Sequence, residues 1–336
     1  MSTFPIFRFL ISLLLLLPLM GQSASEKPLQ ELRVGVLEFG TVNWELAVIQ
    51  NLELAKKRGI DLKIVPLASG DASVIALQGN AVDVIVTDWI WVSRQRAESN
   101  LYSFAPYSNT VGSVMVKPES GIKQLADLKG KKMGVAGGPS DKTWLLLRAY
   151  AQRKLGVDLT QFTEPTYAAP PLLNELALRG QVDAALNHWN YAARLQASGM
   201  RPLITVQEIL KGLGIETQIP LLGWVFREDW AAAHSGLVKD FLAASYEAKA
   251  NLANSESQWE LLRPRMRAEN DAVFTSLRDN FRSGIPVCAE PDSLAAVAAT
   301  FKVLAETGGE KLVGKSKALT PGTFWPGFAL PACKAR

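Results

Sequence analysis

A short apolar run that begins with Val-Asp and ends in a polar residue followed by Trp occurs twice in the chain, in residues 76–89 and 177–189. In each stretch an Ala-Leu pair and a Gly precede the run. Gly commonly ends a helix, and a short apolar run bounded by turn residues is typical of a buried strand. The pattern therefore predicts the same unit twice: the end of a helix, a tight turn and a buried strand.

The repetition extends upstream of both stretches. Apolar residues 34–36 and 133–135 each lead through a loop to a Trp, at positions 44 and 144. Gly followed by Ile or Val, then Asp-Leu, stands at 59–62 and again at 156–159, where we expect a second strand. The same order of landmarks in both halves favours two similar α/β lobes that face each other across a cleft.

The remaining alternation of apolar and polar residues predicts the other elements. In the first half we expect strands at 32–37, 61–67 and 82–87, and helices at 44–58, 69–78 and 88–98. Extended crossovers are expected near 107–117 and 212–226. Beyond residue 228 the pattern is helical, at 237–252, 258–266, 272–281 and 293–306. Because the chain has then crossed back, this tail is expected to pack on the first lobe.

The N-terminus has the pattern of a secretory signal peptide. Arg8 precedes an apolar run over residues 9–20, and small residues follow at 21–25. The run is shorter than the roughly 20 residues of a membrane-spanning helix, so we expect cleavage near residue 25 rather than a retained anchor. In an exported chain the two cysteines, Cys288 and Cys333, are expected to form a disulfide.

Composition narrows the function. Of 336 residues, 36 are Lys or Arg and 32 are Asp or Glu, and the basic residues are scattered, so we expect no nucleic-acid partner. No metal or cofactor is expected, and the common metalloprotease, serine-hydrolase and phosphate-loop motifs are absent from the sequence. His188 and Asp88 could form a catalytic base and its orienting partner across a closed cleft, but no nucleophile is signalled beside them. We therefore expect a binding protein without catalytic residues.

Ligands of open α/β sheets bind beyond the carboxyl ends of the strands. The candidate ligand-binding residues therefore follow the predicted strands, with one more at the return crossover. They are Glu38, Phe39, Thr41, Asn43, Trp44, Thr87, Asp88 and Trp89 in the first lobe, Gly137, Gly138, Ser140, Asp141, Trp144, Asn187, His188 and Trp189 in the second, and Trp224 at the crossover.

These residue types favour some ligands over others. Tryptophan rings stack on planar groups and attract alkylated ammonium groups. Free backbone N–H groups at 137–140 would suit an anion, although Ser140 or Asp141 could instead cap the helix that follows. Trp44 and Trp144 could equally belong to the core. Glu38, Asp88 and Asp141 would repel an anion if they face the cleft rather than cap a helix or point outward, so we expect an aromatic or amine-bearing organic ligand.

Residues 116–132, with the pattern Val-Lys-x-x-Ser-Gly-Ile-Lys-x-Leu-x-Asp-Leu-Lys-Gly-Lys-Lys, are followed by Met-Gly-Val-Ala and a Gly/Ser loop. This stretch resembles the periplasmic solute-binding proteins of nitrate/taurine/sulfonate-type ABC importers, a superfamily that includes thiamine-precursor binders. The resemblance extends over roughly residues 31–226.

The resemblance implies a type II periplasmic-binding-protein fold: lobe 1 at 30–108 and 225–336, lobe 2 at 113–204, and hinge crossovers at 108–113 and 205–224. It also implies a periplasmic monomer that delivers a small-molecule ligand to an ABC permease and, through it, to an ATPase. Docking on a sensor receptor and catalysis on the same fold are the alternatives left open.

Overall fold

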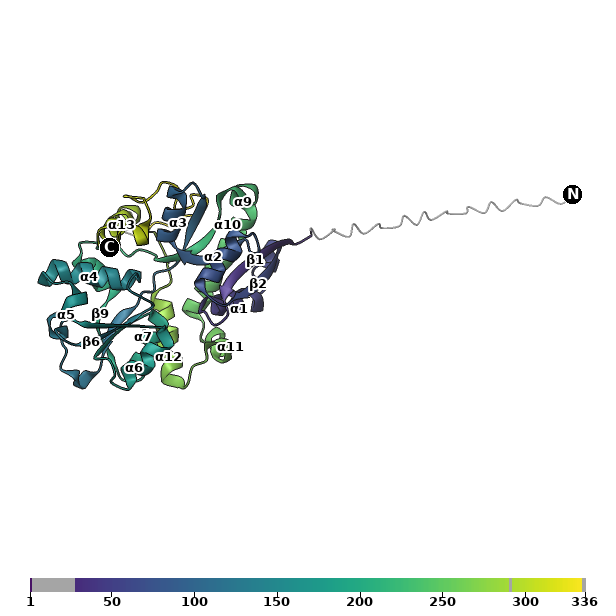
Figure 1. The fold of residues 1–336 in the computed structure, drawn as a ribbon. Coiled ribbons are helices and arrows are strands. Elements are labelled where there is room, and N and C mark those ends of the chain that lie inside the picture. Colours follow the sequence, from purple (N-terminus) through teal and green to yellow (C-terminus); the bar gives the residue numbers. More distant parts are fainter. Residues whose placement is uncertain (2–27, 290–291, 334–336) are drawn as a thin grey trace.

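The computed structural model describes Met1 and residues 28–289 and 292–333, so the predicted signal peptide lies almost entirely outside the described residues. Figure 1 shows two sheets, each covered by helices, side by side in one molecule. None of the helices in the described part of the chain is long and apolar enough to cross a membrane.

The first sheet has the strand order β2-β1-β3-β10-β4. Its strands are β1 (Gln30–Leu37), β2 (Ile60–Leu67), β3 (Val84–Asp88), β4 (Tyr102–Ser108) and β10 (Leu222–Arg227). β1 runs parallel to β2 and β3, whereas β10 runs antiparallel to β3 and β4.

The second sheet has the order β7-β6-β8-β5-β9. Its strands are β5 (Ser113–Val116), β6 (Lys132–Ala136), β7 (Glu164–Ala168), β8 (Ala184–Asn187) and β9 (Arg201–Thr205). β6 is parallel to β7 and β8, and β5 is the antiparallel strand. The two sheets therefore share one topology, and the predicted two-lobed α/β fold is confirmed. Each lobe receives its antiparallel strand from a chain segment that has just crossed from the other lobe.

The helices of the first part of the chain alternate with these strands. They are α1 (Val42–Asn51), α2 (Gly70–Gln78), α3 (Trp89–Ala97), α4 (Lys142–Leu155), α5 (Leu159–Phe162), α6 (Pro170–Leu178), α7 (Trp189–Ala197) and α8 (Val206–Gly212), with single 3₁₀ turns at Lys56–Arg58, Pro118–Ser120 and Leu125–Leu128. Short polar side chains define several starts: Ser69 accepts the Ala72 N–H, and Asp88 accepts the Trp91 N–H.

Two local predictions are wrong. The helix expected to reach residue 58 ends at Asn51, and Glu53 adopts a left-handed φ of 52°, which interrupts the helix. The second Gly-Val-Asp-Leu segment is not a strand. Asp158 accepts the Thr160 N–H and starts the four-residue helix α5, so that the strand follows only at β7.

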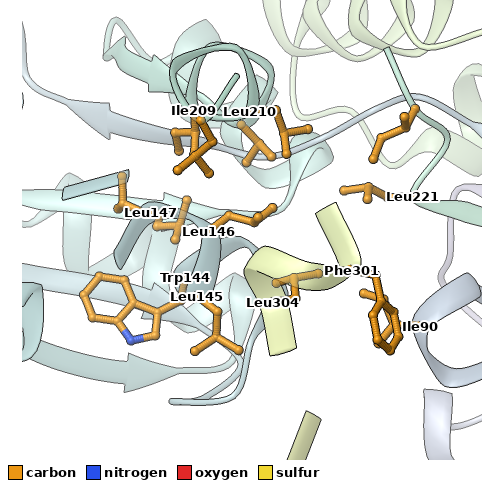
Figure 2. Close-up of a cluster of buried hydrophobic side chains, with 14 of the residues drawn as sticks. Ile90, Trp144, Leu145, Leu146, Leu147, Ile209, Leu210, Leu221, Phe301 and Leu304 are labelled. Atoms are coloured by element: carbon orange, nitrogen blue, oxygen red, sulfur yellow. The ribbon is translucent and has the colours of Figure 1, made fainter. Parts of the chain in front are cut away.

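The helical tail consists of α9 (Glu228–Ala233), α10 (Ser235–Asn254), α11 (Glu256–Met266), α12 (Asp271–Ser283), α13 (Ser293–Gly308) and α14 (Glu310–Val313). As expected, α10 and α11 pack on α1 of the first lobe. The expectation was incomplete, because α12 also packs along α7 and α13 along α4, both in the second lobe. In Figure 2, Leu304 lies beside Leu145 of α4, and Phe301 beside Ile90 of α3, within one hydrophobic cluster.

The predicted disulfide is present between Cys288 and Cys333. It joins the segment between α12 and α13 to the end of the chain. Upstream of Cys333 the chain lies along β4, where the Phe104 N–H donates to Thr323 O and the Trp325 N–H to Phe104 O. The disulfide therefore ties the α12–α13 connection to lobe 1.

Candidate functional site

The predicted site residues of each lobe follow neighbouring parallel strands. In lobe 1, Gly35 of β1 pairs with Ile85 of β3. Glu38 and Asp88 each follow three residues later, so they lie at the same edge of the sheet. In lobe 2, Val135 of β6 pairs with Leu186 of β8. The loops at these strand ends lie where the lobes face each other, and they form two edges of the interlobe cleft that differ in structure.

The open edge is a cavity of about 860 Å³ with walls from both lobes. Its lining comprises the β1–α1 loop (Glu38, Phe39, Gly40, Thr41, Asn43, Trp44), α6 and α7 (Pro171, Asn174, Glu175, Leu178, Asn190, Tyr191, Arg194, Ser198), and the α11–α12 region (Pro264, Arg265, Met266, Arg267, Glu269, Asn270, Val273, Leu277). A cavity of this size can enclose a small organic molecule.

The β1–α1 loop is held by its own amide. The Asn43 Nδ2 donates to the carbonyl oxygens of Leu37 at 2.7 Å, Gly40 at 3.0 Å and Glu38 at 3.2 Å. This bonding leaves the Phe39 ring 67% exposed, with the Arg267 guanidinium 4.1 Å from the ring centre. An exposed aromatic ring with a cation on one face is a surface suited to ligand contact.

Arg194 on α7 fixes the opposite wall. Its guanidinium donates to Met266 O at 3.1 Å and Arg267 O at 3.3 Å, and it forms an ion pair with Glu269. These bonds hold the turn between α11 and α12 against lobe 2 and place Arg267 opposite Phe39.

At the closed edge the lobes touch directly. The Lys142 Nζ, on the first residue of α4, donates to Asp88 Oδ2 at 2.8 Å, while Asp88 Oδ1 accepts the Trp91 N–H and caps α3. Burial alone would raise the pKa of Asp88, but the charge of Lys142 and the hydrogen bonds from Lys142 and Trp91 outweigh it and lower the pKa. Burial would lower the pKa of Lys142, yet the charge of Asp88 raises it.

Asp141 caps α4. This agrees with the interpretation that the loop caps a helix, which was the alternative to an anion site. Its Oδ1 accepts the N–H groups of Thr143 at 2.9 Å and Trp144 at 3.1 Å. Burial would raise its pKa, but the nearby His188 and the hydrogen bonds from Thr143 and Trp144 lower it. The half-exposed His188 lies beside Asp141, with Nε2 3.8 Å from Oδ2, and it forms no ion pair with Asp88.

Three of the predicted tryptophans belong to the core in this conformation. Trp89, Trp144 and Trp224 are 0% exposed, and the Trp224 Nε1 donates to Ser245 Oγ at 3.0 Å. Contrary to the expectation, neither ring faces the cleft in this structure: Trp89, at the start of α3, lies beside Phe301, and Trp224, within β10, packs against Tyr107 and Phe241. Burial of a large apolar ring is favourable in both places. Their contact with a ligand stays a prediction, for a more open conformation.

Trp44 and Trp189 meet across the lobes. Their ring centres are 6.0 Å apart in an edge-to-face arrangement, and Trp189 also lies 6.2 Å from Phe281 of α12. Trp44 lines the cavity but is only 4% exposed. Both rings therefore stabilise the contact between lobes, and Trp44 contributes a small part of the cavity wall.

The remaining predicted residues have different positions. Asn187 is buried, and its Nδ2 donates to Asn174 Oδ1 at 2.8 Å and Pro170 O at 2.9 Å, which orders the start of α6. Thr87 is partly buried at the end of β3. Gly137 has a φ of 81°, a value that favours glycine, and Gly137 and Ser140 are exposed while Gly138 is partly exposed.

Two groups of site residues were missed from the sequence. Lys142 directly follows the predicted residue Asp141 but was not itself predicted. The cavity residues of α6, α7 and the α11–α12 turn follow no strand end, so the strand-end rule could not find them. The arginine-rich run at 263–267 was the available signal. The described residues contain no cluster of His, Cys, Asp and Glu able to hold a metal ion.

A family model described as NMT1/THI5 like matches residues 50–256, more than half of the chain. The chain belongs to the NMT1/THI5-like family. It is 32% identical over 186 residues to the putative aliphatic sulfonates-binding protein of Escherichia coli K12, a match that covers 54% of this chain and 56% of that protein. It is 31% identical over 137 residues to the L-cystine-binding protein TcyJ of the same strain, covering 40% and 46%. The chain thus matches about half the length of these relatives.

Solved structures similar to this NMT1/THI5-like chain include the periplasmic aliphatic sulphonate binding protein SsuA of E. coli, with a TM-score of 0.68, 22% identity, and coverage of 91% of this chain and 95% of that one. The SsuA of Xanthomonas axonopodis pv. citri bound to MOPS gives a TM-score of 0.65 at 19% identity, covering 89% and 99%. At these identities the likeness establishes the fold.

Proposed function

We propose that this chain is the substrate-binding component of an ABC importer, which captures a small organic ligand between its lobes outside the cytoplasmic membrane and delivers it to a membrane permease. Membership of the family and the binding roles in the relatives' names support capture and delivery over sensing or catalysis. The disulfide fits an oxidising compartment, as does the signal-peptide pattern.

The observation that carries the proposal is the 860 Å³ cavity with walls from both lobes. A ligand that contacts both walls favours the closed arrangement, since its binding free energy is largest when the lobes are together. The backbone passes between the two sheets from β4 to β5 and from β9 to β10, and we propose that these crossovers, at 108–113 and 205–224, act as hinges.

The ligand we propose is a small molecule with an aromatic or amine-bearing part. The exposed Phe39 ring offers a stacking surface, and Glu38 on the same loop offers a carboxylate for a cation. The support for an aromatic or amine-bearing ligand comes from the open edge alone, because Trp89, Trp144 and Trp224 have no accessible surface in this conformation.

Two variants of one helix test the cavity. Leu178 and Leu172 of α6 are 42% and 53% exposed, and of the two only Leu178 lines the cavity. Leu178→Trp should narrow the cavity and weaken ligand binding at least about tenfold, or about 1.4 kcal/mol, whereas Leu172→Trp should bind like the wild type. Calorimetry with hits from a metabolite screen provides the measurement. Equal affinities of the two variants would place the ligand elsewhere.

Delivery is tested by uptake. Cells that lack the gene should lose uptake of the labelled ligand, and the wild-type gene or Leu172→Trp should restore it, whereas Leu178→Trp should not. Tight binding with unchanged uptake would favour the sensing alternative instead.

A further inference from the structure

Helix α7 of lobe 2 has apolar residues on two faces. Ala192 and Leu195 belong to the hydrophobic core of lobe 2. Trp189, Ala193 and Ala197 are spaced four residues apart, so they form a separate stripe along the helix. This stripe packs on another part of the molecule.

The stripe packs on α12, in the helical tail (Figure 1). Ala193 is 1% exposed and belongs to the same hydrophobic cluster as Phe274 and Leu277 of α12. Trp189 and Ala197 lie against that cluster, whose other members come from lobe 1 and the tail. Small alanine side chains let two helices approach closely. The contact therefore joins a helix of lobe 2 to the hydrophobic core of lobe 1.

Polar contacts add to this packing. The Ser276 Oγ, on α12, donates to the carbonyl oxygen of Ala193 at 2.8 Å. Arg194, the next residue of α7, forms an ion pair with Glu269 and donates to the carbonyl oxygen of Met266 at 3.1 Å, in the turn before α12. Separation of the two helices would expose the apolar stripe to water and would break these hydrogen bonds, and both changes are unfavourable.

The contact between α7 and α12 lies beside the open-edge cavity. Asn190 and Tyr191 of α7 and Val273 of α12 line the cavity, so both helices supply part of its wall. Ala193 and Ser276 are not among the lining residues. A substitution at either position can therefore change the separation of the two walls without changing a residue that lines the cavity.

We propose that this contact is a latch that holds the two lobes together in the absence of ligand. The latch consists of Trp189, Ala193, Arg194 and Ala197 of α7, together with Ser276 of α12. The ligand then binds to protein that is already closed. Because the apparent dissociation constant is the intrinsic constant divided by the fraction of closed protein, a sufficiently weakened latch lowers affinity even where every ligand contact is kept. The effect on affinity rests on the proposed function, whereas the closure of the empty protein does not.

Small-angle X-ray scattering of the empty wild-type protein, after removal of the signal peptide, tests the latch without a ligand. The radius of gyration should agree with the value calculated from this closed structure. It should stay unchanged when a compound found in the metabolite screen is added at saturating concentration, since the lobes are already together. This measurement does not depend on whether any variant folds.

A variant of α12 tests whether the latch causes the closure. Ser276→Leu places a larger side chain between the two helices and removes the bond to Ala193. The empty variant should have a larger radius of gyration than the wild type, the screened compound should restore the wild-type value, and affinity should fall at least about tenfold. Ser283→Leu makes the same substitution at an exposed position of the same helix, where the hydroxyl donates to Asn280 O, and it should match the wild type in both measurements.

The inference is overturned if the empty wild-type protein is more expanded than this structure and contracts when the compound binds. It is also overturned if Ser276→Leu, shown by circular dichroism to be folded, is as compact as the wild type or binds the compound equally well. In all of these cases a compound still binds, so the proposed function stands. The proposed function fails separately, if no metabolite binds and loss of the gene changes no uptake, and the scattering of the empty proteins still decides whether the latch exists.

Discussion

The two edges of the cleft follow strand ends of similar sequence but have different structures. At the open edge the β1–α1 loop stands away from lobe 2, and Phe39 is accessible. At the closed edge the starts of α3 and α4 meet through Asp88 and Lys142, and the neighbouring tryptophans are fully buried. A position just beyond a strand end therefore does not by itself make a side chain accessible to a ligand. Accessibility depends on whether the side chain packs against neighbouring helices.

The largest effect expected from this comparison is on stability. Trp144→Ala, at the closed edge, should lower the free energy of unfolding by about 3–5 kcal/mol, because a fully buried ring leaves a cavity. Phe39→Ala, at the open edge, should change it by less than about 0.5 kcal/mol and should weaken ligand binding instead. Urea unfolding and calorimetry measure the two effects. A Trp144→Ala protein that is as stable as the wild type but no longer binds ligand would show that the closed edge, not the open edge, contacts the ligand.

The disulfide should have the next largest effect. Cys288 lies between α12, beside the open edge, and α13, beside the closed edge. Replacing both cysteines with Ser should lower the free energy of unfolding by about 2–4 kcal/mol, because the 45-residue separation is no longer constrained in the unfolded chain. Chemical denaturation of the variant and of the oxidised wild type compares them. Equal stability would mean that the tail holds both helices without the disulfide.

A smaller effect is expected at the β1–α1 loop. Asn43→Ala removes three hydrogen bonds to loop carbonyls and should cost about 1 kcal/mol of stability, together with affinity for the ligand. Asn251→Ala, which removes a single bond to Glu247 O on an exposed helix face, is the control. If both variants bind ligand equally well, the conformation of the loop is not needed for binding.

The smallest effect is a pH dependence of the closed edge. The pKa of Asp88 lies below its usual 3.8 in the folded protein, so the ionised carboxylate stabilises the fold above that pH, and this contribution is lost as the pH falls through the lowered pKa. Asp88→Asn should therefore flatten the fall in the free energy of unfolding below pH 3.8. Parallel curves for wild type and variant would show that Lys142 does not stabilise the ionised form.

Much of the fold was predictable because its signals are local. Two sets of apolar strands with the same spacing and the same Gly stops predicted two similar lobes, and the strand orders of the sheets agree. The prediction of a strand at 156–159 failed because its signal was also local. A four-residue match does not indicate whether Asp158 will cap a helix or continue a strand.

The candidate site was predictable only in part. Glu38, Phe39, Thr41, Asn43 and Trp44 were predicted because they follow a strand, and all five line the cavity. The opposite wall depends on contacts between residues far apart in sequence, such as Arg194 with Glu269. Lys142 carries a local signal, because a lysine at the first position of a helix is disfavoured by the helix dipole and needs a partner such as Asp88.

The central claim is that a ligand binds between the lobes at the open edge. A crystal structure of the protein with a ligand found by screening tests it most directly. The account predicts density in the 860 Å³ cavity, in contact with the β1–α1 loop of lobe 1 and with α6 or α7 of lobe 2. Density confined to another hollow, such as that of about 460 Å³ between Arg148 and Gln152 of α4 and Val303 of α13, with the interlobe cavity empty, would contradict it.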